Sequence, residues 1–197
     1  MARPQNTSLG LLDEDSVREL FCLSIPARVD CRLPMRKIVS ATFLSLDGVM
    51  QAPGGPYDIF AGHWPRTPKD DPIGSVFNRV TKYVATHRPE SLGWENSEAL
   101  GPDVLARVRA LKASDGPTLL TQGSSELVHL LLANDLVDEL RVSIFPVLLG
   151  KGKRFFGDAS VPRTFELVKS VTAPNGVFLA TYQRAGEVKT GSFALEA

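Results

Sequence analysis

The sequence predicts an α/β fold, a mostly parallel sheet flanked by helices with an antiparallel C-terminal edge. The first observation behind this prediction is the order of patterns, because short apolar runs typical of buried strands alternate with segments of helical periodicity. The second is the end of the chain, where two strand-like runs flank the turn Pro174-Asn175-Gly176, and an Asn-Gly pair favours a tight hairpin. A chain of 197 residues with 43% hydrophobic residues is long enough for one such domain.

The predicted domain begins near residue 35. Residues 1–34 contain polar stretches and three prolines and show no sustained apolar periodicity, so we expect a poorly ordered N-terminal extension that adds little stability. Residues 35–47 form a near-continuous apolar run that predicts a strand buried on both faces, and it ends at Asp47. Ligands of open α/β sheets bind beyond the carboxyl ends of the strands. Asp47 is therefore either a site carboxylate or a turn residue, and the residues alone favour the turn.

The middle of the chain shows helical periodicity with one short strand. Asp71 fits a helix N-cap, and Pro72 fits the first helical position that follows it. The predicted elements are the end of a helix at 57–61, a helix from 71 to 80, a strand at 82–86, an irregular segment at 91–100 with Trp94 packed against the sheet, and a helix from 102 to 111.

Residues 118–132 combine a short apolar strand, a turn of small residues and a helix. Thr118 to Thr121 form the strand, Gly123-Ser124-Ser125 form the turn, and the apolar face of the helix consists of Leu127, Val128, Leu131 and Leu132. A strand, turn and helix in this order present free backbone N–H groups and a helix dipole to an anion. The turn is thus either a cradle for a phosphate or an ordinary turn with a serine N-cap. The stretch alone favours the ordinary turn.

The C-terminal third predicts a long strand at 140–149, a basic glycine loop at 150–154, strands at 165–170 and 177–182, and a C-terminal tail at 185–197. Pro146 cannot donate to a strand ladder, so it marks a bulge or an edge. Lysine plus arginine and aspartate plus glutamate each number 22, a balance that gives no indication of a nucleic-acid or membrane partner. The two cysteines, Cys22 and Cys31, are expected as reduced thiols in a cytoplasmic protein, and no metal-binding spacing occurs.

Three segments, taken in order, resemble the dihydrofolate reductase-like family, and most closely the C-terminal reductase domain of the bacterial riboflavin-biosynthesis deaminase-reductase. The segments are 35–56 with Ser45-Leu46-Asp47-Gly48, 119–132 with Gly123-Ser124-Ser125, and 136–157 with Val137-Asp138-Glu139-Leu140 and the run from Phe145 to Gly152. The combination in this order is more specific than any one segment. It spans residues 35–184, which we take as one reductase-like domain.

This resemblance implies an oxidoreductase that uses NADPH and acts on a small molecule, as a homodimer. Gly123, Ser124 and Ser125 would hold the cofactor pyrophosphate through backbone N–H groups. The cofactor-binding residues implied in full are Thr42, Phe43, Gln122, Gly123, Ser124, Ser125 and Glu126. Ser45 and Asp47 would lie on the substrate side, where Asp47 would hold a proton-donating water.

The sequence departs from the family between the glycine-proline loop and the helix at Tyr57. Relatives carry a helix and a strand there, and the strand leads into a Gly-Arg-x-Thr turn for the adenosine-side phosphates. Here Pro56 precedes Tyr57 directly, and no Gly-Arg-x-Thr occurs. We therefore expect one central strand and half of the cofactor site to be missing, so that Thr118 to Thr121 or the first strand keeps unpaired backbone groups.

Two classes of function stay open. The first is an NADPH-dependent reductase that transfers hydride to a pyrimidine-type, pteridine-type or related small molecule. The second is a non-catalytic or impaired family member that binds the cofactor weakly because of the internal deletion. Loss of two hydrogen bonds to charged phosphates would weaken binding by on the order of a hundredfold.

Overall fold

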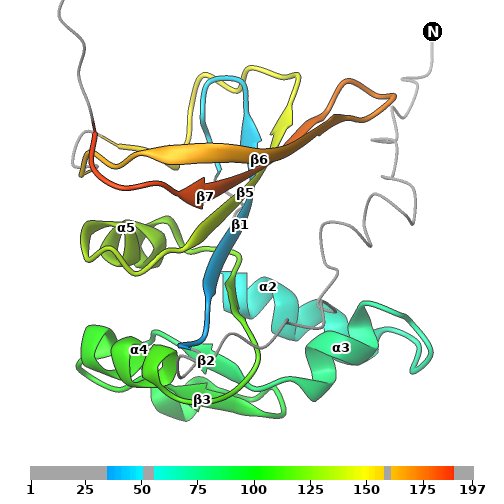
Figure 1. Ribbon diagram of the computed structural model, residues 1–197. Coiled ribbons are helices and arrows are strands. Elements are labelled where there is room, and N and C mark those ends of the chain that lie inside the picture. The colour runs from blue at the N-terminus through cyan, green and yellow to red at the C-terminus, as the bar shows by residue number, and fades with distance from the viewer. Residues whose placement is uncertain (1–34, 51–55, 158–160, 189–197) are drawn as a thin grey trace, which may run out of the picture.

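The computed structural model describes residues 35–50, 56–157 and 161–188, and these ranges contain two separate sheets (Figure 1). A five-stranded sheet has the order β4-β1-β5-β7-β6, and a two-stranded sheet pairs β2 with β3. The strands are β1 (Ile38–Ser45), β2 (Lys82–Val84), β3 (Ser97–Ala99), β4 (Leu119–Thr121), β5 (Glu139–Phe145), β6 (Phe165–Thr172) and β7 (Phe178–Arg184). The helices are α2 (Pro56–His63), α3 (Gly74–Arg79), α4 (Val104–Ala113) and α5 (Ser125–Ala133), with short 3₁₀ helices η1 (Trp64–Arg66) and η2 (Pro89–Ser91). The α/β prediction is confirmed.

Some predictions fall outside the described ranges. They concern the extension over residues 1–34, the two cysteines, the glycine-proline loop before α2 and the tail residues 189–197. The described start of the tail continues from β7, where the Ala185 N–H donates to the Thr164 carbonyl at 2.9 Å. In the parts of the chain that the structure describes, no helix is both long and apolar enough to cross a bilayer.

Strand β1 is the centre of the main sheet and pairs in parallel with β4 on one side and β5 on the other. Its near-continuous apolar sequence is explained by burial, since all but one of its residues are buried. One face of the sheet packs against α4 and α5 in a single core. That core includes Ile38, Leu44, Val108, Leu111, Val128 and Leu131. Val128 is 0% exposed and Leu131 is 3% exposed, which confirms the predicted apolar face of the helix after the glycine-serine turn.

The antiparallel edge forms as predicted, because β7 pairs antiparallel with both β5 and β6. In the turn between β6 and β7, Gly176 has a φ of 82°, a conformation that glycine adopts without strain. Strand β5 is shorter than the sequence predicted, since it ends at Phe145 and not near residue 149. Pro146 follows immediately, and its missing N–H explains the end of the ladder.

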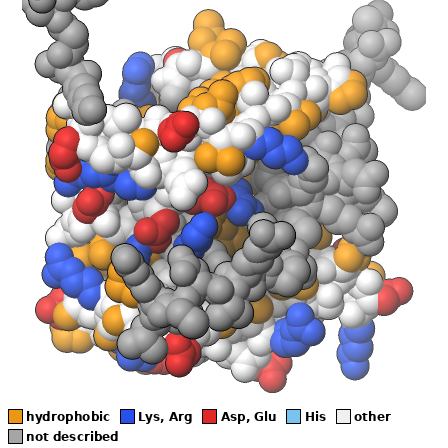
Figure 2. Space-filling view, viewed as in Figure 1, with side chains coloured by type: hydrophobic (Ala, Val, Ile, Leu, Met, Phe, Trp, Pro, Cys, Tyr) orange, Lys and Arg blue, Asp and Glu red, His pale blue; other side chains and the backbone are white. Residues whose placement is uncertain are grey.

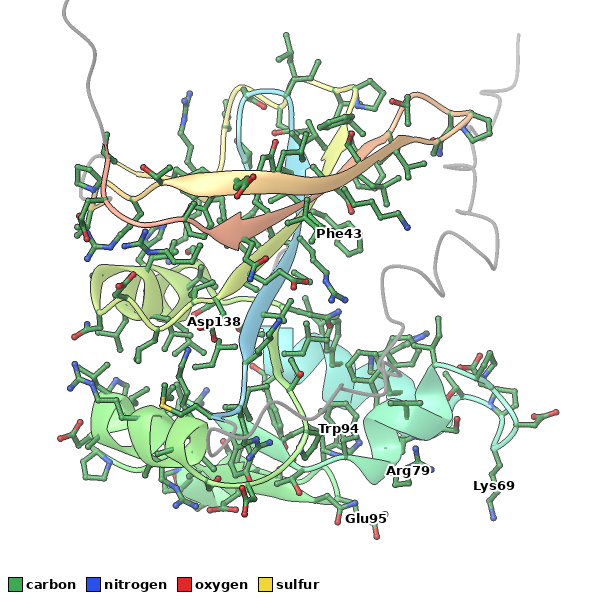
Figure 3. The ribbon with its side chains drawn as sticks, in the orientation of Figure 1. Phe43, Lys69, Arg79, Trp94, Glu95 and Asp138 are labelled. Carbon is green, nitrogen blue, oxygen red and sulfur yellow. The ribbon has the colours of Figure 1, made fainter. Side chains whose placement is uncertain are left out.

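The segment from α2 to β3 has an aromatic cluster of its own. Trp64 stacks on Phe77 with ring centroids 4.9 Å apart, and Phe60 meets both rings. Trp94 is 6% exposed, and its Nε1 donates to Asn78 at 3.0 Å, so this ring packs with α2 and α3 (Figure 3). The expectation that Trp94 packs against the main sheet was wrong. The predicted irregular segment also contains β3, which is too short to give a periodic signal.

The connection between β1 and α2 agrees with the expected deletion. Only residues 51–55 lie between the described end of the β1 loop at Met50 and the start of α2 at Pro56. A crossover with an additional parallel strand needs a dozen residues or more. Among the described residues, β4 pairs with β1 alone, so it forms an edge of the main sheet, and β2 pairs only with β3.

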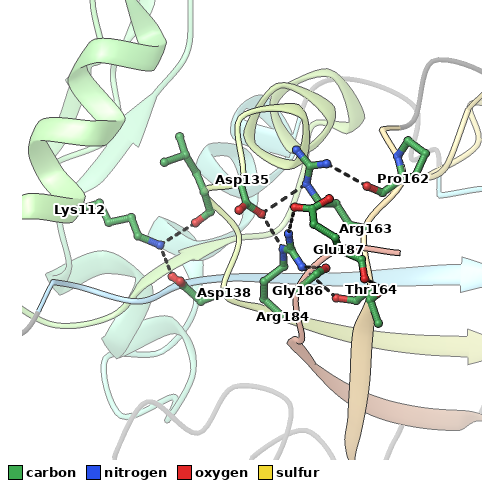
Figure 4. Close-up of polar contacts among 10 residues, drawn as sticks. Lys112, Asp135, Asp138, Pro162, Arg163, Thr164, Arg184, Gly186 and Glu187 are labelled. Atoms are coloured by element: carbon green, nitrogen blue, oxygen red, sulfur yellow. Dashed lines mark hydrogen bonds and ion pairs between the residues drawn. The ribbon is translucent and has the colours of Figure 1, made fainter. Parts of the chain in front are cut away.

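A buried lysine joins α4 to the amino ends of β1 and β5 (Figure 4). Lys112 is 8% exposed, and its Nζ donates to the Leu136 carbonyl at 2.9 Å and to the Asp138 carboxylate. The same carboxylate accepts the Ile38 N–H at 2.7 Å. One carboxylate thus fixes the start of β1 relative to α4 and β5.

A second polar cluster in Figure 4 joins the turn after α5 to the end of β7. Asp135 accepts hydrogen bonds from Arg184 at 2.6 Å and forms an ion pair with Arg163 at 3.4 Å. These two guanidinium groups hold the pKa of Asp135 below its ordinary value, the Arg184 hydrogen bond being the largest cause. The contacts fix the C-terminal hairpin next to the loop that leads into β5.

We predict that Lys112→Met lowers the free energy of unfolding by about 1–3 kcal/mol, since the Asp138 carboxylate and the Leu136 carbonyl lose their charged donor. Urea denaturation measures this change. Arg107→Met is the matched control on the same helix, because Arg107 pairs with Glu98 at 2.5 Å while both side chains are more than 40% exposed. That exposed pair should contribute about 1 kcal/mol or less. Equal losses in the two variants would contradict a special role for Lys112.

Candidate active site

The predicted site residues lie where three parallel strands end. Strands β1, β4 and β5 are adjacent and parallel, so the segments that follow Ser45, Thr121 and Phe145 leave the same edge of the sheet. These segments are the β1 loop at 46–50, the glycine-serine turn at 122–124 and the loop at 146–155. An edge of this kind is the usual ligand-binding position of an open α/β sheet.

The glycine-serine turn has the local geometry of an anion cradle. Gly123 has a φ of 113°, and the peptide bond between Gly123 and Ser124 is cis. Ser124 is the N-cap of α5, and its hydroxyl accepts the Leu127 N–H at 3.4 Å. The backbone N–H groups of Ser125 and Glu126 have no hydrogen-bond partner among the described residues. Two free donors therefore remain at the positive end of the α5 dipole.

Gln122 and Ser125 flank this turn on its inner side. The Gln122 Oε1 atom is buried and has no hydrogen-bond partner in the described parts of the chain. Ser125 is buried, and it forms the first residue of α5. A buried acceptor without a donor is costly, and a bound molecule that carries a hydroxyl or amide N–H would supply the donor.

The first turn of α5 is connected to the loop after β5. Lys153 Nζ lies 2.6 Å from the Glu126 carboxylate, and this hydrogen bond is the main cause that lowers the pKa of Glu126. Lys153 also meets the β1 loop, since its carbonyl accepts the Met50 N–H at 3.0 Å. The predicted cofactor turn and the predicted substrate-side loop are thus linked through the basic glycine loop. The sequence pattern alone did not single out Lys153.

Asp47 organises the other end of that loop. Its carboxylate accepts the Ser45 hydroxyl at 2.5 Å, the Gly150 N–H at 2.8 Å and the Leu149 N–H at 3.3 Å. These bonds, the Ser45 bond first and the Gly150 bond second, lower the pKa of Asp47 to about 2. Asp47 is therefore ionised at neutral pH, and it holds the chain after Pro146 beside the β1 loop. Its role as the holder of a proton-donating water stays a prediction.

The two β1 residues predicted to bind cofactor do not share a face. Thr42 is buried on the side that packs on the helices, whereas Phe43 is 44% exposed on the opposite side (Figure 3). Phe43 meets Phe145 in an edge contact with centroids 5.8 Å apart. Only Phe43 offers its side chain to a ligand on the exposed side, so any contact from Thr42 would have to come through its backbone.

His129 contributes to the site from the inside. Its Nε2 contacts the Phe155 carbonyl, and Phe155 is completely buried. The Phe155 N–H in turn donates to the Gly48 carbonyl at 2.9 Å. Helix α5, the loop after β5 and the β1 loop are therefore fixed to one another by contacts between residues far apart in sequence.

A cleft of about 980 Å³ lies apart from these loops, between α2, α3 and the segment 91–96. Lys69 and Arg79 line it together with Asp58 and Glu95. Figure 3 labels four residues of the cleft, which are Lys69, Arg79, Trp94 and Glu95. All four charged side chains are exposed. The cleft contains none of the residues predicted for cofactor or substrate. Its mixed charge does not select a chemical class of ligand.

We predict that Asp47→Asn lowers the melting temperature, and that the loss is largest near neutral pH. The pKa of Asp47 is depressed in the folded state, so its stabilising contribution is present above about pH 4 and disappears as the pH falls toward 2. Thermal denaturation of the unmodified protein and of Asp47→Asn, at a series of pH values between 7 and 2, measures the difference in melting temperature. A loss in melting temperature that is the same at pH 7 and pH 3 would show that the charge of Asp47 is not its cause.

Comparison with known proteins gives a family match over most of the predicted reductase-like domain. The family model "RibD C-terminal domain" matches residues 58–179, which is more than half of the chain. The uncharacterized protein YyaP of Bacillus subtilis (strain 168) is 26% identical over 133 residues, covering 66% of this chain and 70% of that protein. The uncharacterized protein YwjB of the same organism is 32% identical over 76 residues, 39% of this chain and 44% of that protein.

The chain also matches solved structures. A putative riboflavin biosynthesis protein from Shewanella sp. PV-4 is 22% identical, with a TM-score of 0.49 over 76% of this chain and 99% of that one. Dihydrofolate reductase from Enterococcus faecalis, complexed with NADP(H), is 18% identical, with a TM-score of 0.43 over 75% and 96%. The match of the family model over residues 58–179 shows that the chain belongs to the RibD C-terminal domain family.

Proposed function

We propose that the protein is an NADPH-dependent reductase that transfers hydride to a pyrimidine-type, pteridine-type or related small molecule. The observation that carries this proposal is the turn at 122–126, where free backbone N–H groups, a positive-φ glycine and an unpaired buried amide oxygen meet at one helix N-terminus. The N–H donors fit the pyrophosphate of a dinucleotide, and the amide oxygen would accept a hydrogen bond from a hydroxyl or N–H group of the bound molecule. Membership of a reductase family supports the same choice.

In this proposal the chain binds and orients, and the cofactor, when bound, supplies the hydride. Ser125 and Glu126 would hold pyrophosphate oxygens through their N–H groups. Lys153 neutralises the Glu126 carboxylate at 2.6 Å, so the acidic side chain in the first turn of α5 repels an anion less. Phe43 and Phe145 would cover one side of the reacting ring.

Substrate would lie on the side of the β1 loop. Asp47 is proposed to act there as a positioning residue, since it fixes the Leu149 and Gly150 N–H groups next to Ser45. The Ser45 hydroxyl is itself used within the chain, because it donates to Asp47 and accepts the Val49 N–H at 3.0 Å. The contribution of Ser45 to the site is therefore to support Asp47.

A second candidate is an impaired family member that binds NADPH weakly. The observation in its favour is the edge position of β4 together with the short connection between Met50 and Pro56. The donors that relatives place after the missing strand have no counterpart in the sequence. Lys151 and Arg154 are exposed in the same loop as Lys153, and a contact from either to the second phosphate would compensate for the missing donors.

The oligomeric state and the compartment also belong to the proposal. A homodimer is proposed, and β6 offers a surface for it, because Leu167, Val168 and Val171 are each exposed by 40% or more. In Figure 2 hydrophobic side chains gather on the upper part of the molecule, where Figure 1 places β6 and, above it, the loops after β1 and β5. A cytoplasmic location is proposed from the NADPH requirement.

A titration with NADPH tests the assignment of the turn. Ser124→Asp keeps a good N-cap but adds a negative charge beside the proposed pyrophosphate, so NADPH affinity should fall by about tenfold or more. Ser124→Asn is the matched control, since it caps the helix without the charge, and it should stay within about threefold of the unmodified protein. Isothermal titration calorimetry measures the three affinities.

Three results would change the interpretation. Equal affinities for the aspartate and asparagine variants would remove the cofactor from this turn. Absence of NADPH binding by the unmodified, folded protein would favour the impaired family member. Binding without any loss of NADPH absorbance in the presence of reducible pyrimidines or pteridines would leave cofactor binding but reject the proposed substrate class. We avoid Gly123→Val in this test, because a φ of 113° would strain any β-branched residue and disturb the fold itself.

A further inference from the structure

The outer edge of β4 has free backbone groups in the middle of the fold. The Leu119 N–H donates to the Lys37 carbonyl at 2.8 Å, so this residue directs its backbone toward β1. Backbone groups alternate in direction along a strand, and the N–H and C=O of Leu120 therefore point away from β1. Neither finds a backbone partner among the described residues. An edge of this kind is a template for another strand.

The chain enters the described structure beside this edge. Immediately before β1, the Arg36 N–H donates to the Lys112 carbonyl at 2.8 Å, and the Arg36 Nε donates to the Pro117 carbonyl at 2.6 Å. Lys112 lies in the last turn of α4, and Pro117 lies in the connection from α4 to β4. The chain immediately before β1 therefore lies next to the segment that leads into β4, at the amino ends of the strands.

The upstream sequence contains one short stretch with the character of a buried strand. In the run Phe21-Cys22-Leu23-Ser24-Ile25, the large apolar side chains alternate with two small ones, and Pro26 ends the run. The other undescribed segments, residues 51–55, 158–160 and 189–197, offer no comparable alternation of large apolar residues. Ten residues, 26–35, connect Ile25 to the entry point before β1. At about 3.3 Å each they reach well beyond the two strand spacings, about 10 Å in total, between β1 and a strand outside β4.

We propose that residues 21–25 add to the free edge of β4 as an antiparallel strand and take the place of the strand that the short β1–α2 connection omits. The antiparallel direction follows because the connection leads from Ile25 back to the amino end of β1. A segment of the same chain has a high effective concentration, which favours it over a second molecule at this edge. The proposal replaces our expectation that residues 1–34 add little to the domain, and it does not depend on the proposed enzymatic function.

Amide hydrogen exchange by NMR on the full chain tests this proposal. The Leu120 amide should exchange about a hundredfold or more slowly than an unstructured amide, at a rate independent of protein concentration. Leu23→Pro removes the strand and should return Leu120 to nearly unprotected exchange, while the Leu119 amide, which is bonded to Lys37, stays protected. Gln5→Pro is the matched control, since it places the same residue upstream of the segment and should change neither amide.

The outcomes that overturn the proposal are distinct. Fast exchange of Leu120 in the unmodified chain means that the edge stays open. Slow exchange in both the unmodified chain and Leu23→Pro means that another segment covers the edge, and protection that rises with protein concentration identifies a second copy.

If Leu23→Pro does not fold, a disulfide with Cys22 provides the alternative measurement. Oxidation of a Leu120→Cys, Cys31→Ser chain should then give an intramolecular disulfide with Cys22, whereas the same change at Leu167 on β6 should not.

Discussion

The length of the connection between β1 and α2 determines much of this structure. Five residues between Met50 and Pro56 cannot provide a helix and a parallel strand, so the strands divide into a sheet of five and a pair. The segment from α2 to β3 consequently depends on its own aromatic cluster around Trp64 and Phe77. The main sheet keeps the elements that fix the candidate site, because β1, β4 and β5 remain adjacent and parallel.

Two carboxylates keep β1, β5 and the loops next to them in place, one at each end of the sheet. At the amino end, Asp138 receives both the Ile38 N–H and the Lys112 ammonium group. At the carboxyl end, Asp47 receives N–H groups from the loop after β5 and is ionised far below neutral pH. Desolvation raises the pKa of Asp47, but the hydrogen bonds from Ser45 and Gly150 outweigh it and decide its protonation state.

The sequence alone predicted those elements that depend on patterns within a short stretch of residues. The burial of β1 follows from its apolar run, and the C-terminal hairpin follows from Asn175-Gly176. Contacts between distant residues could not be predicted in this way. The pairing of Lys153 with Glu126 and the contact of His129 with Phe155 depend on how three loops converge after folding. The missing strand was predictable only because a known family supplied the expected pattern for comparison.

The candidate cofactor turn depends on the least supported strand of the main sheet. Gly123 and Ser124 follow directly from β4, which has three residues and pairs on one side only among the described elements. Free N–H groups stabilise an anion best when they are already fixed in position, since ordering them on binding consumes part of the interaction free energy. Whatever covers the outer edge of β4 would thus also hold the turn in place. Completion of the sheet and affinity for a phosphate are therefore expected to be coupled, although the two sites share no residue.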